Sequence, residues 1–393
     1  MISRRSFLVS LNAITLASTL SGCSSNAAMA RVVLLKGSIP TQLLNEFLST
    51  LARKNPLNFQ AKTQLQDLFK LLETLHDRQK ADRTEASRIL WNRSTPKLPN
   101  VDLVTIGNYW LTEAIKEKLI EPLKIEKVRG WQNLPPSCQK LVRRNDRGEL
   151  EEKGEIWAAP YRWGTTIIAY RRDKLKNFGW TPADWSDLWR EELRDRISLL
   201  NHPREVIGLT LKKLGYSYNT TDLNKVSNLE SEIISLQKQV KFYSSTEYLQ
   251  PLILGNTWLA VGWSSDILPL LAANPNIKAI IPSSGTALWA DLWAKPAVKD
   301  TSPDTDIIQE WINFCWQPKP ASEISLLTNA ASPVVSTINP AELLKDIRDN
   351  PLVRLNSSIL DKSEFIEPLS KSSQQQYYAL WEKIYKIRTS RSN

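Results

Sequence analysis

Cysteine and histidine are scarce in this chain of 393 residues, which limits the kinds of site that it can build. The sequence has three cysteines and two histidines, and neither His76 nor His202 has a partner at a metal-ligand spacing. Three cysteines cannot form a disulfide scaffold, although a single bridge between Cys138 and Cys315 stays open as an alternative. We therefore expect no metal site and no cofactor.

Sequence signatures of common enzymes are missing as well. The chain has 13 glycines, and none belongs to a Gly-x-Ser-x-Gly nucleophile motif or to a Gly-x-x-x-x-Gly-Lys phosphate loop. Neither histidine lies near a serine and an aspartate that could form a triad with it. The sequence therefore predicts a protein that is not an enzyme.

Long apolar runs are absent, and the charge is mixed. No stretch beyond residue 22 is apolar over the roughly 20 residues that a membrane helix needs. The net charge is +10, but acids interrupt the basic residues, as in KEKLIE at 116–121, which argues against nucleic acid as a partner. Some of this charge could face anionic lipid instead. Tryptophan is plentiful, with 15 copies that suit either a core or the walls of a ligand site.

The N-terminus carries two export signals on one short segment. SRRSFL at 3–8 places a twin-arginine pair before an apolar stretch at 7–20, which is typical of the export route for folded proteins. That stretch is too short to span a bilayer. LSGC at 20–23 resembles the bacterial lipobox, which implies a signal peptide at 1–22, a lipid on Cys23 and a tether at 23–30.

Strand and helix patterns alternate along the chain. Apolar runs predict strands at 31–35, 57–59 and 101–106, and apolar residues at spacings of three and four predict helices at 41–48, 65–75 and 111–120. This order indicates a parallel sheet covered by helices. A charged surface insertion is expected at 77–99 and a loop-rich stretch at 125–156. Further strands are expected at 164–170, 259–263 and 277–281, and further helices at 185–189, 205–214, 229–240, 307–314 and 377–387.

Three groups of motifs, taken in order, resemble one family. They are APYRWGTT at 159–166, then WSDLW at 185–189 with REV at 204–206 and LKKLG at 211–215, then IIP at 280–282 with WAD at 289–291. Together they resemble the spermidine/putrescine-binding proteins of bacterial ABC importers, which belong to the extracellular solute-binding proteins. The resemblance extends from about residue 31 to about residue 390.

The resemblance implies an α/β fold of the periplasmic-binding-protein-like type II, a clamp of two lobes between which the chain crosses twice. Lobe 1 would comprise residues 31–160 and 290–335, and lobe 2 residues 161–289 and 336–393. Ligand would lie in the cleft between the lobes, and closure by hinge motion would bury it.

The resemblance also implies which residues bind the ligand. Each ammonium group of a polyamine needs a carboxylate, and its methylene groups need apolar or aromatic walls. Asp291 and Glu205 match the carboxylates of the family, and Trp289 matches its aromatic wall. Trp263 ends the predicted strand at 259–263, where the alternation of side chains would point it into the cleft as a further wall. Asp291 could instead be a helix N-cap, Glu205 an acid favoured by a helix dipole, and the tryptophans core residues.

Other positions are less regular. Tyr109 and Trp110 follow a predicted strand at its carboxyl end, so one of them is expected to face the cleft. Trp163, at the crossing between lobes, is a further candidate for the ligand site that could equally serve hinge packing. His202, which replaces an aspartate of the family, and Ser38 of the first-strand loop are candidates as well, whereas Lys36 of that loop would repel an ammonium group if it faced the cleft. The stretch near 363–365 shows no clear equivalent of a late glutamine of the family.

We therefore expect the substrate-binding lipoprotein of an ABC importer, most simply one that binds a polyamine-like cation such as spermidine or putrescine. Its partners would be the solute, the permease in the membrane and the membrane surface, and it would work as an exported, periplasmic monomer. The departures at His202 and Lys36 leave a smaller diamine, a monoamine, a zwitterion or another small solute, including an amino acid or a sugar, as alternatives. A receptor that feeds no transporter is a further alternative. An exported hydrolase with Asp291 and Glu205 as its acid–base pair is disfavoured.

Overall fold

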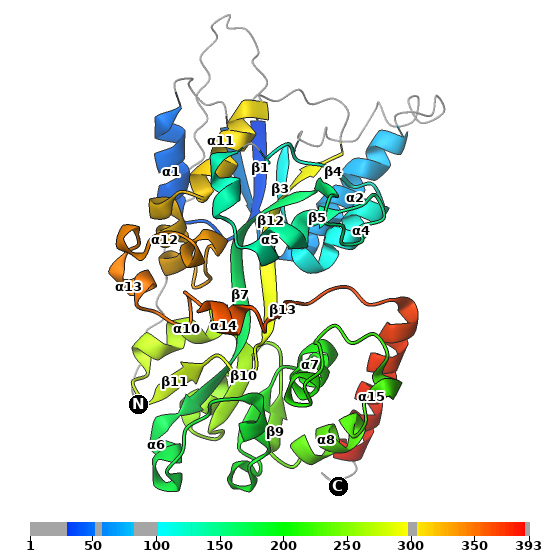
Figure 1. Ribbon diagram of the computed structural model, residues 1–393, viewed down its shortest axis with the longest axis vertical. Helices are drawn as coiled ribbons and strands as arrows, with labels where there is room; N and C mark the ends of the chain where they lie inside the picture. The colour runs from blue at the N-terminus through cyan, green and yellow to red at the C-terminus, as the bar shows by residue number, and fades with distance from the viewer. Residues whose placement is uncertain (1–29, 52–56, 82–100, 127, 298–304, 390–393) are drawn as a thin grey trace, which may run out of the picture.

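The structure, a computed structural model, describes residues 30–51, 57–81, 101–126, 128–297 and 305–389. The twin-arginine segment, Cys23 and most of the 77–99 insertion lie outside the described residues. The described chain forms two lobes, one above the other in Figure 1, with two long strands running between them. The mixed α/β fold is therefore the two-lobed clamp that the sequence predicts.

The first lobe is built on a parallel sheet. Strands β1 (Ala30–Leu35), β2 (Leu57–Lys62) and β3 (Leu103–Gly107) are parallel, with β1 between the other two. Helix α1 (Thr41–Thr50) connects β1 to β2, and helix α2 (Leu65–Ala81) follows β2. β3 is buried along its whole length, as expected for a strand with covered faces. The predicted order of strands and helices in this region is confirmed.

Two long strands carry the chain between the lobes. β7 (Ala158–Arg171) and β12 (Ala287–Pro296) run antiparallel to each other. The second half of β7 pairs with β10 (Leu259–Trp263) and β11 (Ile277–Ile280) of the second lobe, whereas β12 pairs with β3 of the first. One continuous ladder of strands therefore passes through both lobes (Figure 1).

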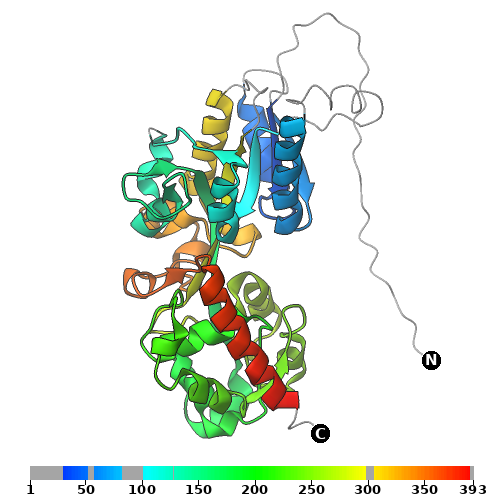
Figure 2. The same ribbon diagram turned by 90° about the vertical axis from the view of Figure 1, so that its right-hand side faces the viewer.

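The second lobe completes the ladder and is covered by helices. β8 (Ile197–Leu199) joins β10 to β9 (Val240–Tyr243) by parallel pairing. Helices α7 (Pro203–Lys213), α8 (Leu229–Leu236) and α15 (Lys371–Thr389) share a separate apolar cluster. α15, red in Figure 2, lies along the outside of this lobe.

Shorter elements fill the connections. In the first lobe and around the crossing these are α4 (Leu111–Lys116), β4 (Ile120–Glu121), α5 (Pro136–Val142), β5 (Arg143–Arg144), β6 (Glu155–Ile156), α11 (Thr305–Cys315), α12 (Pro318–Leu327), α13 (Lys345–Arg348), α14 (Ser357–Leu360) and β13 (Glu364–Phe365). In the second lobe these are α6 (Arg172–Leu175), α9 (Gln250–Leu254) and α10 (Ser264–Ala273). Within the described ranges, no helix combines the length and apolarity needed to cross a membrane.

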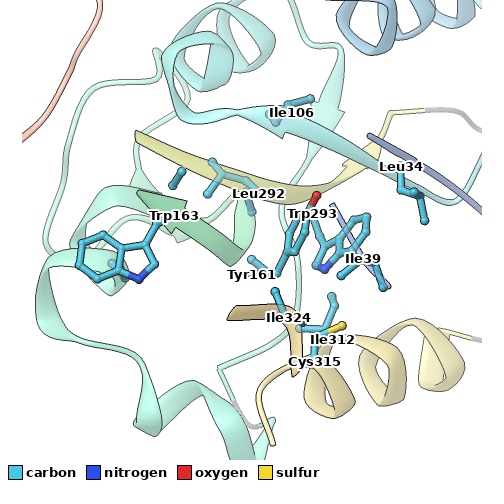
Figure 3. Packing of buried hydrophobic residues seen from close by; sticks show 14 of the residues in the cluster. Leu34, Ile39, Ile106, Tyr161, Trp163, Leu292, Trp293, Ile312, Cys315 and Ile324 are labelled. Atoms are coloured by element: carbon cyan, nitrogen blue, oxygen red, sulfur yellow. The ribbon is translucent and has the colours of Figure 1, made fainter. Parts of the chain in front are cut away.

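Aromatic stacking holds the core of the first lobe. The rings of Tyr161 and Trp293 lie face to face, with centroids 4.1 Å apart and planes 16° apart (Figure 3). Cys315 lies close by and, like Cys138, is a buried free thiol, so the alternative of a bridge between the two is wrong. Burial raises the pKa of Cys138 to about 12, which keeps this thiol protonated and unreactive.

Several sequence-based boundaries need correction. The helix expected at 111–120 ends at Lys116, because Lys118 has a φ of 54°, and the chain then enters β4. The helix expected at 229–240 ends at Leu236, and Val240 already begins β9. The heptad-like apolar spacing continues from this helix to Val240, the first residue of β9, so the two elements resembled one helix in the sequence.

Other corrections concern elements that the sequence analysis did not anticipate. The loop-rich stretch at 125–156 contains α5, which begins at Pro136, and the 77–99 insertion begins inside α2. The motif at 289–291 lies within the long strand β12, which explains why no helix starts there. A helix N-cap role for Asp291 is therefore wrong.

Candidate functional site

A cavity of about 480 Å³ lies between the two lobes, which is within the usual size range of small-molecule sites. The loop after β3 contributes from the first lobe, and α7, the end of β10 and α15 contribute from the second. The residues that line it are Leu35, Leu65, Gly107, Asn108, Tyr109, Trp110, Arg162, His202, Pro203, Arg204, Glu205, Trp263, Ser265, Leu288, Trp289, Ala290, Asp291, Ile366, Leu369, Gln374, Tyr377 and Tyr378.

One end of the cavity holds a buried ion pair. Asp291 of β12 lies opposite Arg162 of β7 in the antiparallel ladder, which brings the two side chains together. Nε and Nη2 of Arg162 lie 2.8 and 2.7 Å from Oδ2 of Asp291. Burial raises the pKa of Asp291, and the Arg162 guanidinium opposes this shift. The carboxylate that the family resemblance assigns to a ligand ammonium therefore already has a cationic partner within the chain.

The same guanidinium also lies near an aromatic face. Cζ of Arg162 is 5.7 Å from the ring centroid of Trp289, a cation–π distance. The Trp289 ring in turn lies against Gly164, where a Cβ would overlap Cζ2 of Trp289 and lie 2.8 Å from Oγ of Ser264. Only glycine leaves room for the indole at this point of β7.

The other carboxylate, Glu205, is held by neutral donors. Oε1 accepts a hydrogen bond from Nε1 of Trp263 and Oε2 one from Oγ1 of Thr166, each at 3.0 Å. Burial raises the pKa of Glu205, whereas these two hydrogen bonds lower it. Glu205 lies in the first turn of α7, so its favourable interaction with the helix dipole and its position on the cavity occur together.

Two basic residues, His202 and Arg204, precede Glu205 at the start of α7. Nη1 of Arg204 donates to the carbonyl of Glu367, and Nη2 donates to the carbonyl of Tyr218 and to Oδ1 of Asn219. His202 precedes the helix, and burial, together with the charge of Arg204, lowers its pKa. Burial and the charge of Arg204 therefore favour the neutral form of His202, which adds no positive charge to the cavity.

Aromatic side chains form much of the remaining wall. Both Tyr109 and Trp110 line the cavity, and Trp110 stacks on Phe69 of α2 with ring centroids 5.6 Å apart. From the opposite side α15 contributes Tyr377 and Tyr378. Flat rings on both sides suit a slender, partly apolar solute.

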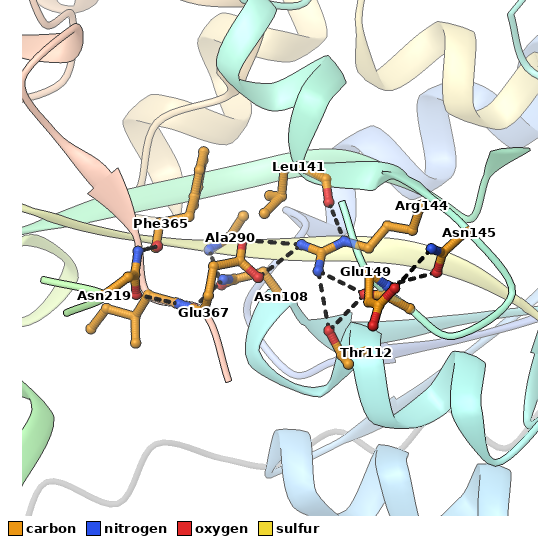
Figure 4. A network of polar contacts seen from close by, with 12 residues as sticks. Asn108, Thr112, Leu141, Arg144, Asn145, Glu149, Asn219, Ala290, Phe365 and Glu367 are labelled. Carbon is orange, nitrogen blue, oxygen red and sulfur yellow. Dashed lines mark hydrogen bonds and ion pairs between the residues drawn. The ribbon is translucent and has the colours of Figure 1, made fainter. Parts of the chain in front are cut away.

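A polar network beside the cavity ties the lobes to the connecting segment after β13. Arg144 is 2% exposed and donates two hydrogen bonds of 3.0 Å to the carboxylate of Glu367 (Figure 4). The backbone N–H of Glu367 donates to Asn219 of the second lobe. Asn108, from the first lobe, donates to the carbonyl of Ile366 and accepts from the N–H of Ala290. This segment therefore links β3, β12 and the second lobe at the mouth of the cavity.

Two of the residues proposed from the sequence lie away from the cavity. Ser38 is fully buried and accepts a hydrogen bond of 2.8 Å from the Tyr161 hydroxyl. Trp163 is 1% exposed and packs near Phe365, with centroids 6.5 Å apart. Lys36 is exposed and does not line the cavity, so the repulsion considered for it does not arise. The cationic side chains that line the cavity are instead Arg162 and Arg204.

Sequence reasoning missed several lining residues. Arg162 stands inside the APYRWGTT motif, and a charged residue in the interior of a largely apolar strand was the available signal. Its partner Asp291 is 129 residues away in the chain, so the pair itself could not be read from the sequence. Gln374 of α15 also lines the cavity, further along the chain than the stretch searched for a late glutamine. Within the described residues, no group of histidine, cysteine and acidic side chains is arranged to hold a metal ion.

Comparisons with known proteins agree with this architecture. A family model described as bacterial extracellular solute-binding protein matches residues 99–363. The spermidine/putrescine-binding periplasmic protein of Salmonella typhimurium is 27% identical over 224 residues, which cover 57% of this chain and 61% of that protein. A putrescine-binding periplasmic protein of Pseudomonas aeruginosa is 26% identical over 303 residues, covering 72% of this chain and 78% of the relative. The chain thus spans about three-fifths of the length of the Salmonella relative.

Solved structures share the fold over nearly the whole chain. A spermidine/putrescine ABC transporter substrate-binding protein from Streptococcus pneumoniae superposes with a TM-score of 0.74 at 20% identity, covering 92% of this chain and 99% of the other. A lipoprotein of Treponema pallidum superposes with a TM-score of 0.62 at 17% identity, covering 91% and 99%. Both likenesses establish the two-lobed clamp.

Proposed function

Because this chain belongs to the bacterial extracellular solute-binding proteins, we propose that it captures a small organic amine in the interlobe cavity and delivers it to the permease of an ABC importer. The relatives are binding proteins rather than enzymes, in agreement with the sequence-based expectation. The observation that carries the proposal is the Glu205 carboxylate, which is buried at the cavity between aromatic side chains.

The chemistry of Glu205 favours an ammonium group. Its two hydrogen bonds come from Trp263 and Thr166, which are neutral, so lone pairs of the carboxylate remain for a donor on the ligand. The charge of Arg204 favours the ionised form of Glu205, and burial disfavours it. A buried carboxylate is stabilised by a cation, and the neighbouring ring faces attract one as well. Relatives named for spermidine and putrescine support the same broad class of ligand.

Hinge motion about the crossing strands would admit and enclose the solute. β7 and β12 pass between the lobes, and residues of both lobes line the cavity. In the open clamp, solute would reach Glu205 and the aromatic walls, and closure would then remove it from water. The permease would recognise the closed form, because closure brings the two lobes into one defined arrangement.

The export signals fit this role. We infer a signal peptide at 1–22, a lipid on Cys23 and a tether at 23–30, which would hold a periplasmic monomer at a membrane surface. We also infer that lobe 1 comprises residues 31–160 and 290–335 and that lobe 2 comprises residues 161–289 and 336–393. A Cys23→Ala variant should be released from the membrane fraction, whereas continued membrane association would contradict the lipid anchor.

A thermal-shift screen of the purified protein tests solute binding. The panel contains polyamines, monoamines, amino acids, sugars and small anions, because a ligand that prefers the native state raises Tm. We expect a shift with an amine, and its loss in Glu205→Gln. A shift only with sugars or anions would contradict an amine ligand. The control variant Glu46→Gln alters an exposed pair with Lys319 and should respond as the wild type does.

Delivery to a permease needs a separate test. A candidate ABC permease from the same organism would be reconstituted in lipid vesicles, and ATP hydrolysis would be measured with and without the liganded protein. Stimulation that requires both protein and solute supports the import role. Binding of a solute without any stimulation would point to a receptor that feeds no transporter.

A further inference from the structure

Arg162 occupies the place at Asp291 that the family resemblance gives to a cationic ligand group. Its guanidinium takes the Asp291 carboxylate through two nitrogens and approaches the Trp289 ring at 5.7 Å. A carboxylate and an aromatic face are the two features with which a protein holds an ammonium group. At this end of the cavity the chain therefore provides its own cation.

The charges on the cavity wall are balanced without ligand. Arg162 and Arg204 supply two positive charges, and Asp291 and Glu205 supply two negative ones. A diamine would bring two further positive charges into a site whose wall is already neutral. Unpaired charge is costly in such a buried place, because little water remains to solvate it.

We propose that this chain selects a solute with a single ammonium group, bound at Glu205, and a hydrogen-bond acceptor, most simply a carboxylate, bound at Arg162. This inference rests on the proposed function and narrows the ligand of the same cavity. Putrescine and spermidine, with an ammonium group at each end, are excluded as preferred ligands.

The two arginines differ in what they can offer to a ligand. Both Nη atoms of Arg204 donate to protein oxygens, so its guanidinium is occupied in holding the connecting segment and the second lobe together. Among the described residues, the polar contacts of the Arg162 guanidinium reach only Asp291: Nε donates a hydrogen bond to Oδ2, and Nη2 lies 2.7 Å from the same oxygen. Arg162 also lines the cavity, so Nη1 is the donor available to an acceptor on the ligand.

A second ammonium group would have two unfavourable choices at this end. It could displace Arg162 from Asp291 and leave a buried guanidinium without its partner, which is strongly unfavourable. Alternatively, it could approach the intact pair and meet the guanidinium charge. Either choice weakens a diamine relative to a ligand of the same length with a carboxylate in place of the second ammonium.

Three four-carbon probes test the inference, because they share one ammonium group and differ only at the other end. 4-Aminobutyrate carries a carboxylate there, butylamine a methyl group and putrescine a second ammonium. Calorimetric titration of the wild-type protein should give the affinity order 4-aminobutyrate, butylamine, putrescine, with at least about tenfold between the first and last. Putrescine as the tightest of the three would overturn the inference.

The variant Arg162→Met should reverse the preference. It keeps an unbranched side chain of similar length, removes the internal cation and frees Asp291 for a ligand ammonium. We expect the affinity ratio of putrescine to 4-aminobutyrate to rise by about 100-fold or more. The variant gains a partner for the second ammonium group of putrescine and loses the partner of the 4-aminobutyrate carboxylate. An unchanged ratio would overturn the inference. Arg162→Lys retains the charge and should retain the wild-type order.

Arg190 provides a matched control. It pairs with Asp187 at 3.0 Å and lies 4.2 Å over the Trp180 ring, so it repeats the chemistry of Arg162 away from the cavity. Arg190→Met should leave the affinity ratio unchanged. A change as large as that of Arg162→Met would show that the ratio reports general charge rather than the cavity, which would also overturn the inference.

If none of the three probes binds, the solute that copurifies with the protein tests the inference. It would be released by denaturation and treated with a reagent that adds one mass label to each primary amine. One label supports the inference, whereas two labels or none overturn it. The proposed function fails only if the protein neither copurifies with an organic amine nor is stabilised by one, so the two failures can be told apart.

Discussion

The two carboxylates of the cavity are alike in burial but differ in what satisfies them. Asp291 is 1% and Glu205 is 4% exposed, yet Asp291 is paired with a guanidinium and Glu205 accepts from an indole and a hydroxyl. The first carboxylate has a cationic partner within the protein, whereas, among the described residues, no cationic side chain donates a hydrogen bond to the second. A carboxylate can therefore occupy the position of a ligand contact and still be unavailable to a ligand.

The location of each acid in the fold explains this difference. Asp291 lies on a crossing strand, where the neighbouring strand places Arg162 directly opposite. Glu205 lies at the start of α7, where its neighbours are the strand residues Thr166 and Trp263. One substitution on β7 is thus enough to change one end of the site while the other end stays as it is.

The comparison predicts its largest effect on stability at Asp291. Asp291→Asn leaves the Arg162 guanidinium buried without its partner and should lower the free energy of unfolding by about 3–5 kcal/mol. Urea denaturation followed by tryptophan fluorescence measures this loss. The double variant Arg162→Met, Asp291→Leu should recover most of it. If Asp291→Asn alone were as stable as the wild type, Arg162 would not be the main partner of this aspartate.

The next effect concerns ligand affinity at Glu205. Glu205→Gln keeps the size of the side chain but removes the charge that would face a ligand ammonium. Affinity for an amine that binds the wild type should fall by about 30-fold or more, as expected when one partner of a buried charge pair is removed. Calorimetric titration measures the loss. An affinity within a factor of two of the wild type would place the ammonium elsewhere.

A smaller effect is expected from Gly164→Ala. The new Cβ would overlap the Trp289 ring, which must move away from Gly164 and thereby change the wall beside Arg162. Overpacking of this kind costs about 1–3 kcal/mol of stability. Thermal unfolding and the affinity for an amine should both be affected. Gly179→Ala, at a position with nothing within 4 Å of the new Cβ but a φ of +71°, separates backbone strain from this contact.

The smallest effect is a pH dependence of amine binding. Burial raises the pKa of Glu205, so the carboxylate takes up a proton above the usual range as the pH falls. Protonation removes the charge that attracts the ammonium, and affinity should fall by up to about tenfold for each pH unit below this pKa. His202, whose pKa burial lowers, becomes positive only at lower pH and would add repulsion.

The pH experiment has a direct control. In His202→Asn the dependence should remain near the pKa of Glu205, whereas in Glu205→Gln that part of the profile should disappear. Titration calorimetry at a series of pH values gives both curves. A profile that is unchanged in Glu205→Gln would assign the titration to another group.

Much of the fold could be predicted from local patterns, whereas the site depended on contacts between distant residues. The apolar run of β1 and the helical spacing of α1 are local properties and were read correctly. β12 was not anticipated, because Asp291 and two tryptophans obscure its period, and the family motif drew attention to single residues instead. Tertiary pairing, rather than propensity, decides its structure.

The candidate site shows the same limit. Trp289 and the residues at the start of α7 were found because they stand in recognisable motifs, and Trp263 because it ends a predicted strand. The role of Arg162 depends on the register between β7 and β12, and no motif records that register. Trp163 lies on the crossing strand β7, as expected, but it packs near Phe365 and does not line the cavity, whereas its neighbour Arg162 does.

A crystal structure of the protein with the solute that it is found to bind would test the central claim most directly. We predict electron density for one ammonium group within hydrogen-bond distance of Glu205, with Arg162 still bound to Asp291 and an acceptor of the solute facing the guanidinium. An ammonium group on Asp291, with Arg162 displaced from the cavity, would contradict the account.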